Sequence, residues 1–395
     1  MKLTLPLPRV DGTLAPFTLS GRTAWQAPAA PSFNRIAFSA AHVVADPRAA
    51  IDPWLDCAID CDATLACRQR LWRMGLGVAE AMDTAQRGMG VDWPTSLELI
   101  RRSLDAARDV PGALVASGCG TDQLAPEAAR SVDDVIRAYE EQMAAIEGLG
   151  GRLIVMASRA LARVATSPAD YERVYDRLLR QASEPVILHW LGDMFDPALA
   201  GYWGSSDVDA AMDTALAVIA ANPGKVDGIK ISLLDKNREI QMRRKLPGGV
   251  RMYTGDDFNY AELIAGDGAG SAPTHGRSDA LLGIFDAIAP AASAALSALA
   301  AGDETRFHSI LAPTVPLSRH IFKAPTRFYK TGVVFMAWLN GHQSHFTMVG
   351  GQHSARSLLH FAELFRLADA AGLIEQPELA VQRMRQLLAL HGVPG

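Results

Sequence analysis

The feature that most constrains the fold is a regular alternation of strand-like and helix-like segments. Short apolar runs, each followed by a helix-like segment, predict strands at 34–40, 75–82, 112–117, 152–157, 185–190, 226–234, 249–254 and 266–271. Strands that alternate with helices form parallel sheets, because a parallel connection needs a crossover. Eight such units over about 250 residues have the size of a (β/α)8 TIM barrel. The competing doubly wound fold is disfavoured, since no G-x-G-x-x-G sequence follows an early strand.

The pattern divides the chain into three parts. Residues 1–32 form an N-terminal extension, in which Leu3–Leu7 and Phe17–Leu19 are expected to pair as a hairpin and to cover one end of the main domain. Residues 33–302 form the barrel, whose first helix is expected to begin at Pro53. Residues 303–395 read as almost wholly helical. We therefore expect a barrel that carries an appendage of C-terminal helices packed on it.

Composition excludes several classes of protein. With 49% hydrophobic and 21% charged residues the chain is ordinary globular material, and a net charge of −5 argues against a general nucleic-acid binder. The apolar runs are too short to span a membrane, and the N-terminus lacks the apolar core of a signal peptide. We therefore expect a cytoplasmic protein that binds neither nucleic acid nor membrane. The cysteines lack the second ligand pair of a zinc site and predict buried thiols: Cys57, Cys61, Cys67 and Cys119.

A lysine interrupts the apolar run Val226–Leu234. Strands covered by helices on both faces read as continuous apolar runs, so Lys230 is out of place there. Burial pushes a lysine toward the neutral amine, which is the nucleophile that forms Schiff bases with carbonyl substrates. Strand alternation places Ser232 on the same face as Lys230. The open alternatives are a lysine paired with a buried acid and a lysine that faces solvent at the strand end.

Polar residues at the carboxyl ends of the other strands complete the predicted site, because the active site of such a barrel lies there. His189 ends the fifth strand and is the candidate proton shuttle, since the pKa of histidine lies near working pH. A core histidine bonded to the backbone is the alternative. Asp256 and Asp257 can also cap the helix that follows them. The residues expected to bind the substrate are Thr84, Ser232, Thr254, Asp256, Ser271 and His275.

The second half of the chain resembles the dihydrodipicolinate synthase and N-acetylneuraminate lyase superfamily. The motifs that carry this resemblance are Pro185-Val-Ile-Leu188, Asp227-Gly-Ile-Lys230, Tyr253-Thr-Gly-Asp-Asp257, Gly266-Asp-Gly-Ala-Gly-Ser271 and Ala300-Ala-Gly-Asp303. The resemblance covers residues 180–375 well and residues 34–180 loosely. It implies a (β/α)8 barrel with C-terminal helices, usually tetrameric, in which Lys230 forms a Schiff base with a 2-keto acid.

The same resemblance exposes three departures. The family carries a tyrosine at the end of strand five, where this chain has His189 and Trp190. The family's Gly-Thr-Thr-Gly-Glu loop, which binds the substrate carboxylate, has no counterpart nearer than Asp83-Thr-Ala-Gln86. The strand-four loop lacks the family's Pro-Tyr-Tyr. These departures define a divergent branch and point to a carbonyl substrate of sugar-derived type.

Three hypotheses of function follow. The first is a class I aldolase, lyase or dehydratase that acts on a keto acid or keto-sugar derivative, with Lys230 as nucleophile and His189 as proton shuttle. It needs no cofactor and no metal, and the resemblance implies a homo-oligomer, either dimer or tetramer. The second is a metal-dependent sugar isomerase or epimerase that uses Asp83, His189, Asp256 and His275. The third is a catalytically silent barrel that binds a small ligand.

Overall fold

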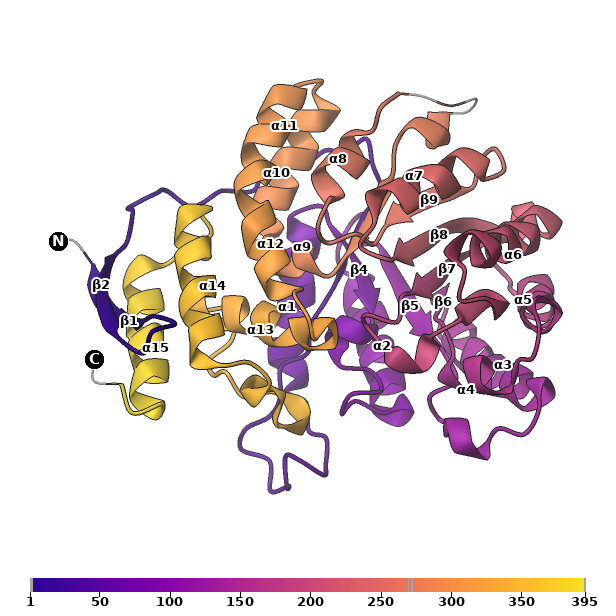
Figure 1. The fold of residues 1–395 in the computed structure, drawn as a ribbon, viewed down its shortest axis with the longest axis horizontal. Coiled ribbons are helices and arrows are strands. Elements are labelled where there is room, and N and C mark those ends of the chain that lie inside the picture. Colours follow the sequence, from indigo (N-terminus) through magenta and orange to yellow (C-terminus); the bar gives the residue numbers. More distant parts are fainter. Residues whose placement is uncertain (1–2, 269, 271–272, 394–395) are drawn as a thin grey trace.

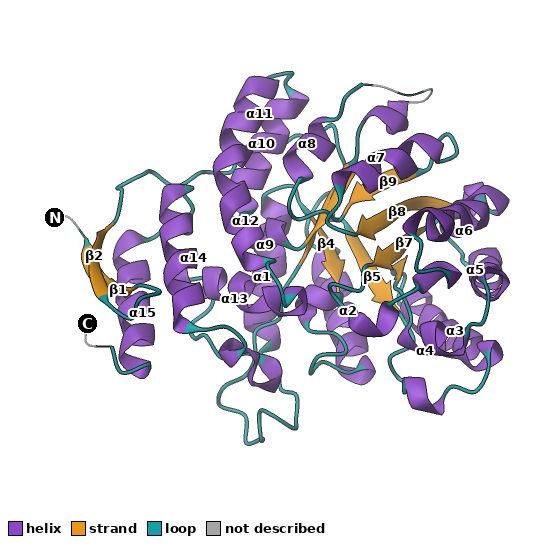
Figure 2. Ribbon diagram, viewed as in Figure 1, coloured by secondary structure: helices purple, strands orange, loops and turns teal. Residues whose placement is uncertain are grey.

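Eight parallel strands close into a barrel in this computed structural model, which describes residues 3–268, 270 and 273–393. The order around the barrel is β10-β3-β4-β5-β6-β7-β8-β9. Figure 2 shows the strands at the centre of one half of the molecule with helices outside them. The strands are β3 (Ala37–Ala40), β4 (Gly77–Glu80), β5 (Val115–Cys119), β6 (Arg152–Val155), β7 (Val186–Leu191), β8 (Val226–Ser232), β9 (Arg251–Thr254) and β10 (Asp279–Leu282). The predicted (β/α)8 barrel is confirmed.

Most of the outer helices, though not the short helices Tyr260–Ala265 and Ile284–Ala287, begin at a side chain that accepts a hydrogen bond from the first turn. Ser131 and Asp134 form a reciprocal capping box, and Pro168 occupies the first turn of the helix that Ser167 caps. These helices are α1 (Cys61–Arg73), α2 (Trp93–Ala107), α3 (Val132–Gly148), α5 (Pro168–Gln181), α6 (Val208–Ala221), α7 (Lys236–Lys245) and α8 (Tyr260–Ala265), with the short α4 (Arg159–Val164) and α9 (Ile284–Ala287) at the barrel mouth. Within the described residues, no helix is long and apolar enough to cross a membrane.

Large side chains fill the inside of the barrel below its mouth. Strand alternation turns every second residue inward, and these residues form one buried cluster that includes Phe38, Ile154, Ile187, Tyr253 and Leu281. Gly228 makes room for Tyr253, because a Cβ at Gly228 would lie 2.7 Å from the Tyr253 ring. The next inward residues toward the mouth, His189 on β7 and Lys230 on β8, lie on top of this packed layer.

The C-terminal helices form a second layer beside the barrel (Figure 1). They are α10 (Ala289–Ala300), α11 (Glu304–Leu311), α12 (Val315–Ile321), α13 (Tyr329–Leu339), α14 (Leu358–Ala370) and α15 (Pro377–Leu390). Helix α13 packs against α9 at the barrel mouth, so this layer reaches the end of the barrel where a site is expected. Helices α10 and α11, which precede and follow residue 302, pack on each other. The boundary between barrel and C-terminal helices at residue 302 stays a prediction.

The N-terminal hairpin forms as predicted but lies elsewhere. Strand β1 (Thr4–Pro8) pairs with β2 (Leu14–Thr18), and β1 contacts α14 and α15. Figure 1 shows both termini on this side of the molecule. The expectation that the extension covers an end of the barrel was therefore wrong. Leu5 and Leu7 bury their side chains against the C-terminal helices, and Arg366 on α14 donates to the carbonyl of Pro8.

Two predicted elements were placed wrongly. The eighth strand is Asp279–Leu282 rather than 266–271, because Gly266 ends α8 with a φ of 82° and the following residues lead back to the start of the strand. The first helix begins at Cys61 rather than Pro53, since Asp60 caps it by accepting from the backbone of Ala63. The cysteines are free thiols; Cys67 and Cys119 are buried, whereas Cys57 and Cys61 are half-buried.

Candidate active site

Lys230 lies in the middle of β8 and points into the barrel. It pairs in register with His189 on β7 and with Tyr253 on β9, and it is 7% exposed. Gly255 makes room for its stem, because a Cβ there would lie 2.8 Å from Cε of Lys230. Among the described residues the Lys230 amine forms no hydrogen bond or ion pair at contact distance. Neither alternative for this lysine, a salt bridge or a solvent-facing position, is therefore what the structure shows.

The electrostatic surroundings of Lys230 favour its neutral form. Burial lowers the pKa of Lys230 below its ordinary value, while the carboxylates of Asp83 and Asp257 oppose that shift. Burial has the opposite effect on the acid and raises the pKa of Asp257 to about 7. The Asp257 carboxylate accepts a hydrogen bond of 2.9 Å from the backbone N–H of Ile284. A buried amine thus shares the barrel mouth with an acid that titrates near neutral pH.

His189 lies beside Lys230 with both ring nitrogens buried and without a hydrogen-bond partner in the described chain. The alternative of a core histidine bonded to the backbone is therefore not observed. Burial, and then the charge of Lys230, lower the pKa of His189 well below its ordinary value. The expectation that this pKa lies near working pH was wrong. A neutral imidazole can nevertheless relay a proton by accepting at one nitrogen and donating from the other.

The two aspartates of the Gly-Asp-Asp sequence play different parts. Asp256 accepts from the backbone N–H groups of Phe258 at 2.8 Å and of Asn259 at 3.0 Å, so it stabilises its own turn. Asp257 is the one whose charge acts on Lys230. The sequence alone could not separate these neighbours, because either residue could have turned back to the loop. The cap interpretation thus describes the observed bonds of Asp256.

The remaining predicted residues divide between the mouth and the outside of the barrel. Ser232 shares the inner face of β8 with Lys230 and is buried. Thr84 follows β4, and its hydroxyl lies 2.7 Å from the hydroxyl of Tyr329 on α13. The prediction that Thr254 binds the substrate was wrong. Tyr253 takes the inner face of β9, so Thr254 faces outward and donates to Glu239 at 2.9 Å.

The misplaced eighth strand also displaces His275 from the predicted site. The described residues 273–278 lead into β10, so they lie at the amino end of the strands, opposite the mouth. Nε2 of His275 lies there, 2.8 Å from the carbonyl of Leu246, which belongs to the loop that enters β9. The prediction that His275 lies at the mouth was therefore wrong. Ser271 lies outside the described residues.

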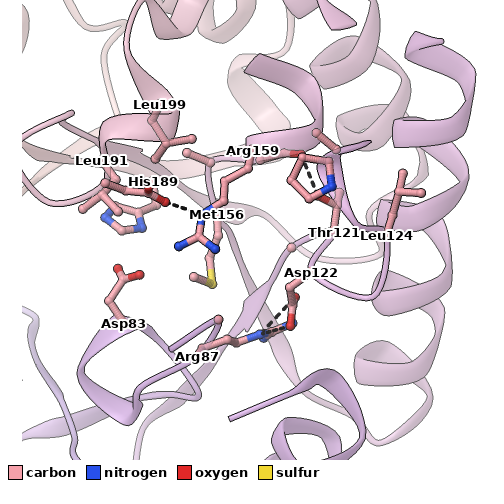
Figure 3. Close-up of a pocket in the computed structure, with 17 residues that line it drawn as sticks. Asp83, Arg87, Thr121, Asp122, Leu124, Met156, Arg159, His189, Leu191 and Leu199 are labelled. Carbon is pink, nitrogen blue, oxygen red and sulfur yellow. Dashed lines mark hydrogen bonds and ion pairs between the residues drawn. The ribbon is translucent and has the colours of Figure 1, made fainter. Parts of the chain in front are cut away.

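A cavity of about 260 Å³ opens at the mouth beside His189, the neighbour of Lys230 in register on β7. Figure 3 shows Asp83 and His189 on one side of it and Thr121 and Asp122 on the other. The loops after β4, β5, β6 and β7 supply its wall, which includes Asp83, Arg87, Gly120, Thr121, Asp122, Met156, Ser158, Arg159, His189, Leu191, Asp196 and Leu199. Sequence reasoning gave the strand ends but not Arg87 or Asp122, which follow no motif.

The donor set of the metal-dependent hypothesis is not assembled. Asp83 and His189 line the cavity, but Asp256 is bonded to its own turn and His275 lies at the other end of the barrel. Across the described ranges, no group of three or more His, Cys, Asp or Glu side chains is arranged to hold a metal ion. The residues proposed for a sugar isomerase therefore do not form one site.

Comparison with known proteins agrees with the fold. YagE of E. coli, a protein of the dihydrodipicolinic acid synthase family solved in complex with pyruvate, has a TM-score of 0.64 at 14% identity, over 87% of this chain and 100% of that chain. The dihydrodipicolinate synthase of Cyanidioschyzon merolae with lysine bound has a TM-score of 0.62 at 14% identity, over 86% and 99%. That of Aquifex aeolicus has a TM-score of 0.59 at 12% identity, over 91% and 99%. Curated proteins give no significant sequence match.

The structural likeness confirms the predicted resemblance at the level of the fold. A family model described as "Protein of unknown function (DUF993)" matches residues 5–393, nearly the whole chain. This chain therefore belongs to the DUF993 family, a divergent branch with the fold of the dihydrodipicolinate synthases.

Proposed function

We propose that this protein is a class I lyase of the aldolase or dehydratase type, in which Lys230 forms a Schiff base with a keto acid or keto-sugar derivative. The observation that carries the proposal is a buried amine with a lowered pKa and no partner at contact distance in the described residues, beside His189, which lines a cavity. The fold it shares with YagE, which was solved in complex with pyruvate, supports the same interpretation. A silent barrel is less well supported, since no described residue caps the amine.

The chemistry follows from the nucleophile. The neutral Lys230 amine attacks the carbonyl carbon of the substrate to form a carbinolamine, which loses water to give an iminium. In an aldol cleavage the iminium accepts the electrons of the adjacent C–C bond, the hydroxyl of the departing fragment loses its proton, and the resulting enamine is then protonated. In a dehydration the iminium accepts the electrons of the adjacent C–H bond, and the enamine expels the hydroxyl of the next carbon as water. Hydrolysis of the iminium then releases the product and restores the amine.

Protons must move from the attacking nitrogen and to the departing hydroxyl. We assign this relay to His189, with the Asp257 carboxyl, whose pKa is about 7, as the second proton carrier.

Borohydride trapping tests the proposal. Borohydride reduces an iminium to a stable secondary amine, so incubation with a panel of keto acids and keto-sugars should leave a covalent adduct on the peptide that contains Lys230. The Lys230→Ala protein is the control and should give none. Absence of an adduct with every member of a broad panel, or an adduct on another lysine only, would show that the proposal is wrong.

We also infer a homo-oligomer, dimer or tetramer, in a cytoplasmic setting. Trp54 and Leu55 are 74% and 77% exposed on the loop before α1, an apolar surface of the kind that subunit contacts cover. Light scattering on the purified protein should give a mass of two or four chains, and the Trp54→Ser variant should shift it toward one. A wild-type protein that stays monomeric at high concentration contradicts the inference.

A further inference from the structure

One cation reaches into the cavity with unused donors. Arg159 follows β6, and its Nε donates to Asp196 at 2.5 Å, which fixes the side chain at one point. Its Nη1 lies 3.4 Å from where a Cβ at Gly88 would be, so the guanidinium crosses the cavity from the β6 loop to the β4 loop. In Figure 3 its two terminal nitrogens lie between the His189 side and the Asp122 side. Neither forms a hydrogen bond within the described residues.

The other arginine of the cavity is fully engaged. Arg87 donates to both carboxylate oxygens of Asp122, to Gln142 and to the carbonyl of Gly118, and it is buried. This pair neutralises Asp122 and holds the β5 loop in place. Asp196 is held in turn by Nε of Arg159. The Nη edge of Arg159 is thus the free cationic group on this wall, with 42% of the side chain exposed.

The position of Arg159 relative to Lys230 limits which part of a substrate Arg159 can bind. Arg159 lines the cavity from the loop after β6, whereas Lys230 belongs to β8, and β7 with His189 lies between them. Arg159 therefore meets a part of the substrate that lies away from the carbonyl at Lys230. Asp83 also lines the cavity on the Lys230 side, where its charge repels an anion and accepts hydrogen bonds from hydroxyl groups. An acidic group on the substrate fits at Arg159 but not next to Asp83.

We propose that Arg159 selects substrates that carry an acidic group, a carboxylate or a phosphate ester, several bonds away from the ketone that meets Lys230. A guanidinium binds either anion through two parallel N–H bonds, and its planar fork fits both. Arg159 then has the role of an acid clamp on the loop after β6. The inference rests on the proposed function, which places the carbonyl of the substrate at Lys230 and so directs its other end toward Arg159.

Matched ketones with and without a distal acid test this clamp. Levulinate is compared with 2-pentanone for the carboxylate, and dihydroxyacetone phosphate with dihydroxyacetone for the phosphate. The measurement is the concentration that gives half-maximal borohydride trapping on Lys230. For the preferred acid, the charged member should need about 10- to 100-fold less than its neutral match, as expected for hydrogen bonds to a charged group.

Arg159→Gln should remove that preference, so that the charged member needs as high a concentration as its neutral match. Arg163→Gln is the matched control, because Arg163 is exposed on the same short helix α4 and does not line the cavity. A preference for the carboxylate pair or for the phosphate pair identifies which acid the clamp takes. Equal trapping of charged and neutral members by the wild-type protein, or an unchanged preference in Arg159→Gln, overturns the inference.

A binding measurement separates this inference from the proposed function. Calorimetry of levulinate and of dihydroxyacetone phosphate with the Lys230→Met protein requires no imine. Binding that disappears when Arg159→Gln is added supports the clamp, even if no ketone is ever trapped on Lys230. Absence of binding of both compounds, or binding that Arg159→Gln leaves intact, overturns it whatever the trapping shows.

Discussion

Two buried lysines lie near the same barrel mouth and differ in their surroundings. Lys230 belongs to β8, and its amine has no partner at contact distance among the described residues. Lys330 belongs to α13 and donates to the carbonyl of Arg327 at 3.0 Å and to the sulfur of Met89 at 3.2 Å. Its amine also lies 4.7 Å from the centre of the Tyr329 ring. Burial lowers the pKa of both, that of Lys330 to about 8.

The comparison separates a perturbed pKa from a reactive group. Burial alone shifts the pKa of each lysine, so the shift does not by itself identify a nucleophile. The Lys330 amine donates hydrogen bonds to fixed acceptors, and these bonds stabilise the contact between α13 and the β4 loop. Lys230 keeps its amine available beside a cavity, at the expense of stability. The difference predicts opposite effects of the same substitution at the two positions.

The largest expected effect is that of replacing each lysine by methionine. Lys230→Met should abolish the borohydride adduct and raise the free energy of unfolding by about 1–3 kcal/mol, because an apolar side chain replaces a buried amine that has no hydrogen-bond partner among the described residues. Lys330→Met should keep the adduct and lower that free energy by about 1–3 kcal/mol, because the Arg327 carbonyl loses its donor. Mass spectrometry and urea unfolding measure the two quantities. The reverse pattern would assign the chemistry to α13.

Next in size is the effect of removing the imidazole beside Lys230. His189→Asn should slow trapping by about a hundredfold or more, the usual contribution of a positioned proton carrier, while leaving the adduct on Lys230. Rapid-quench trapping with a saturating ketone gives the rate. His308→Asn serves as control, since His308 is a half-buried histidine on α11 that does not line the cavity. An unchanged rate in His189→Asn would leave proton transfer to Asp257.

The pH dependence of trapping distinguishes the two neighbouring aspartates. The Asp257 carboxylate raises the pKa of Lys230 against the effect of burial. Asp257→Asn removes that charge, so the pKa of Lys230 falls further and the neutral amine persists to lower pH. The acid limb of the rate should therefore move to lower pH in Asp257→Asn and stay in place in Asp256→Asn. A shift produced by Asp256→Asn alone would exchange their roles.

The smallest expected effect concerns the link between α13 and the barrel. Tyr329→Phe removes the hydrogen bond to Thr84 and should cost about 1 kcal/mol of stability without loss of the adduct. Tyr260→Phe is a matched control, since Tyr260 forms a similar buried bond of 2.5 Å with Thr314. Loss of the adduct in Tyr329→Phe would mean that α13 takes part in the chemistry and would end the contrast between the two lysines.

Sequence reasoning predicted the barrel because its strand and helix periods repeat along the chain. It placed Lys230 on an inner face, because successive side chains of a strand point to opposite faces and this pattern can be read from a few neighbouring residues. It misplaced strand eight because β10 has only four residues and a longer glycine-rich run precedes it. Thr254 was assigned to the wrong face, although the inward position of Tyr253, its neighbour, follows from the register with Lys230.

The parts of the site that escaped prediction come from contacts between distant segments. Tyr329 meets Thr84 across 245 residues, and no periodicity reports such a pair. The pKa of His189 depends on burial and on the charge of Lys230, which is 41 positions away in sequence but adjacent in the barrel. The place of Arg159 in the cavity was not predicted, because its reach toward Gly88 is set by the positions of two loops.

The bond between Thr84 and Tyr329 also orders events during synthesis of the protein. All eight strands have left the ribosome once Leu282 has emerged, and the barrel can then close. The wall behind Asp83 and Thr84 is completed only when α13, at 329–339, has been translated and docked. Translation therefore delivers every strand of the barrel, Lys230 included, before the helix that bonds to Thr84 at its mouth.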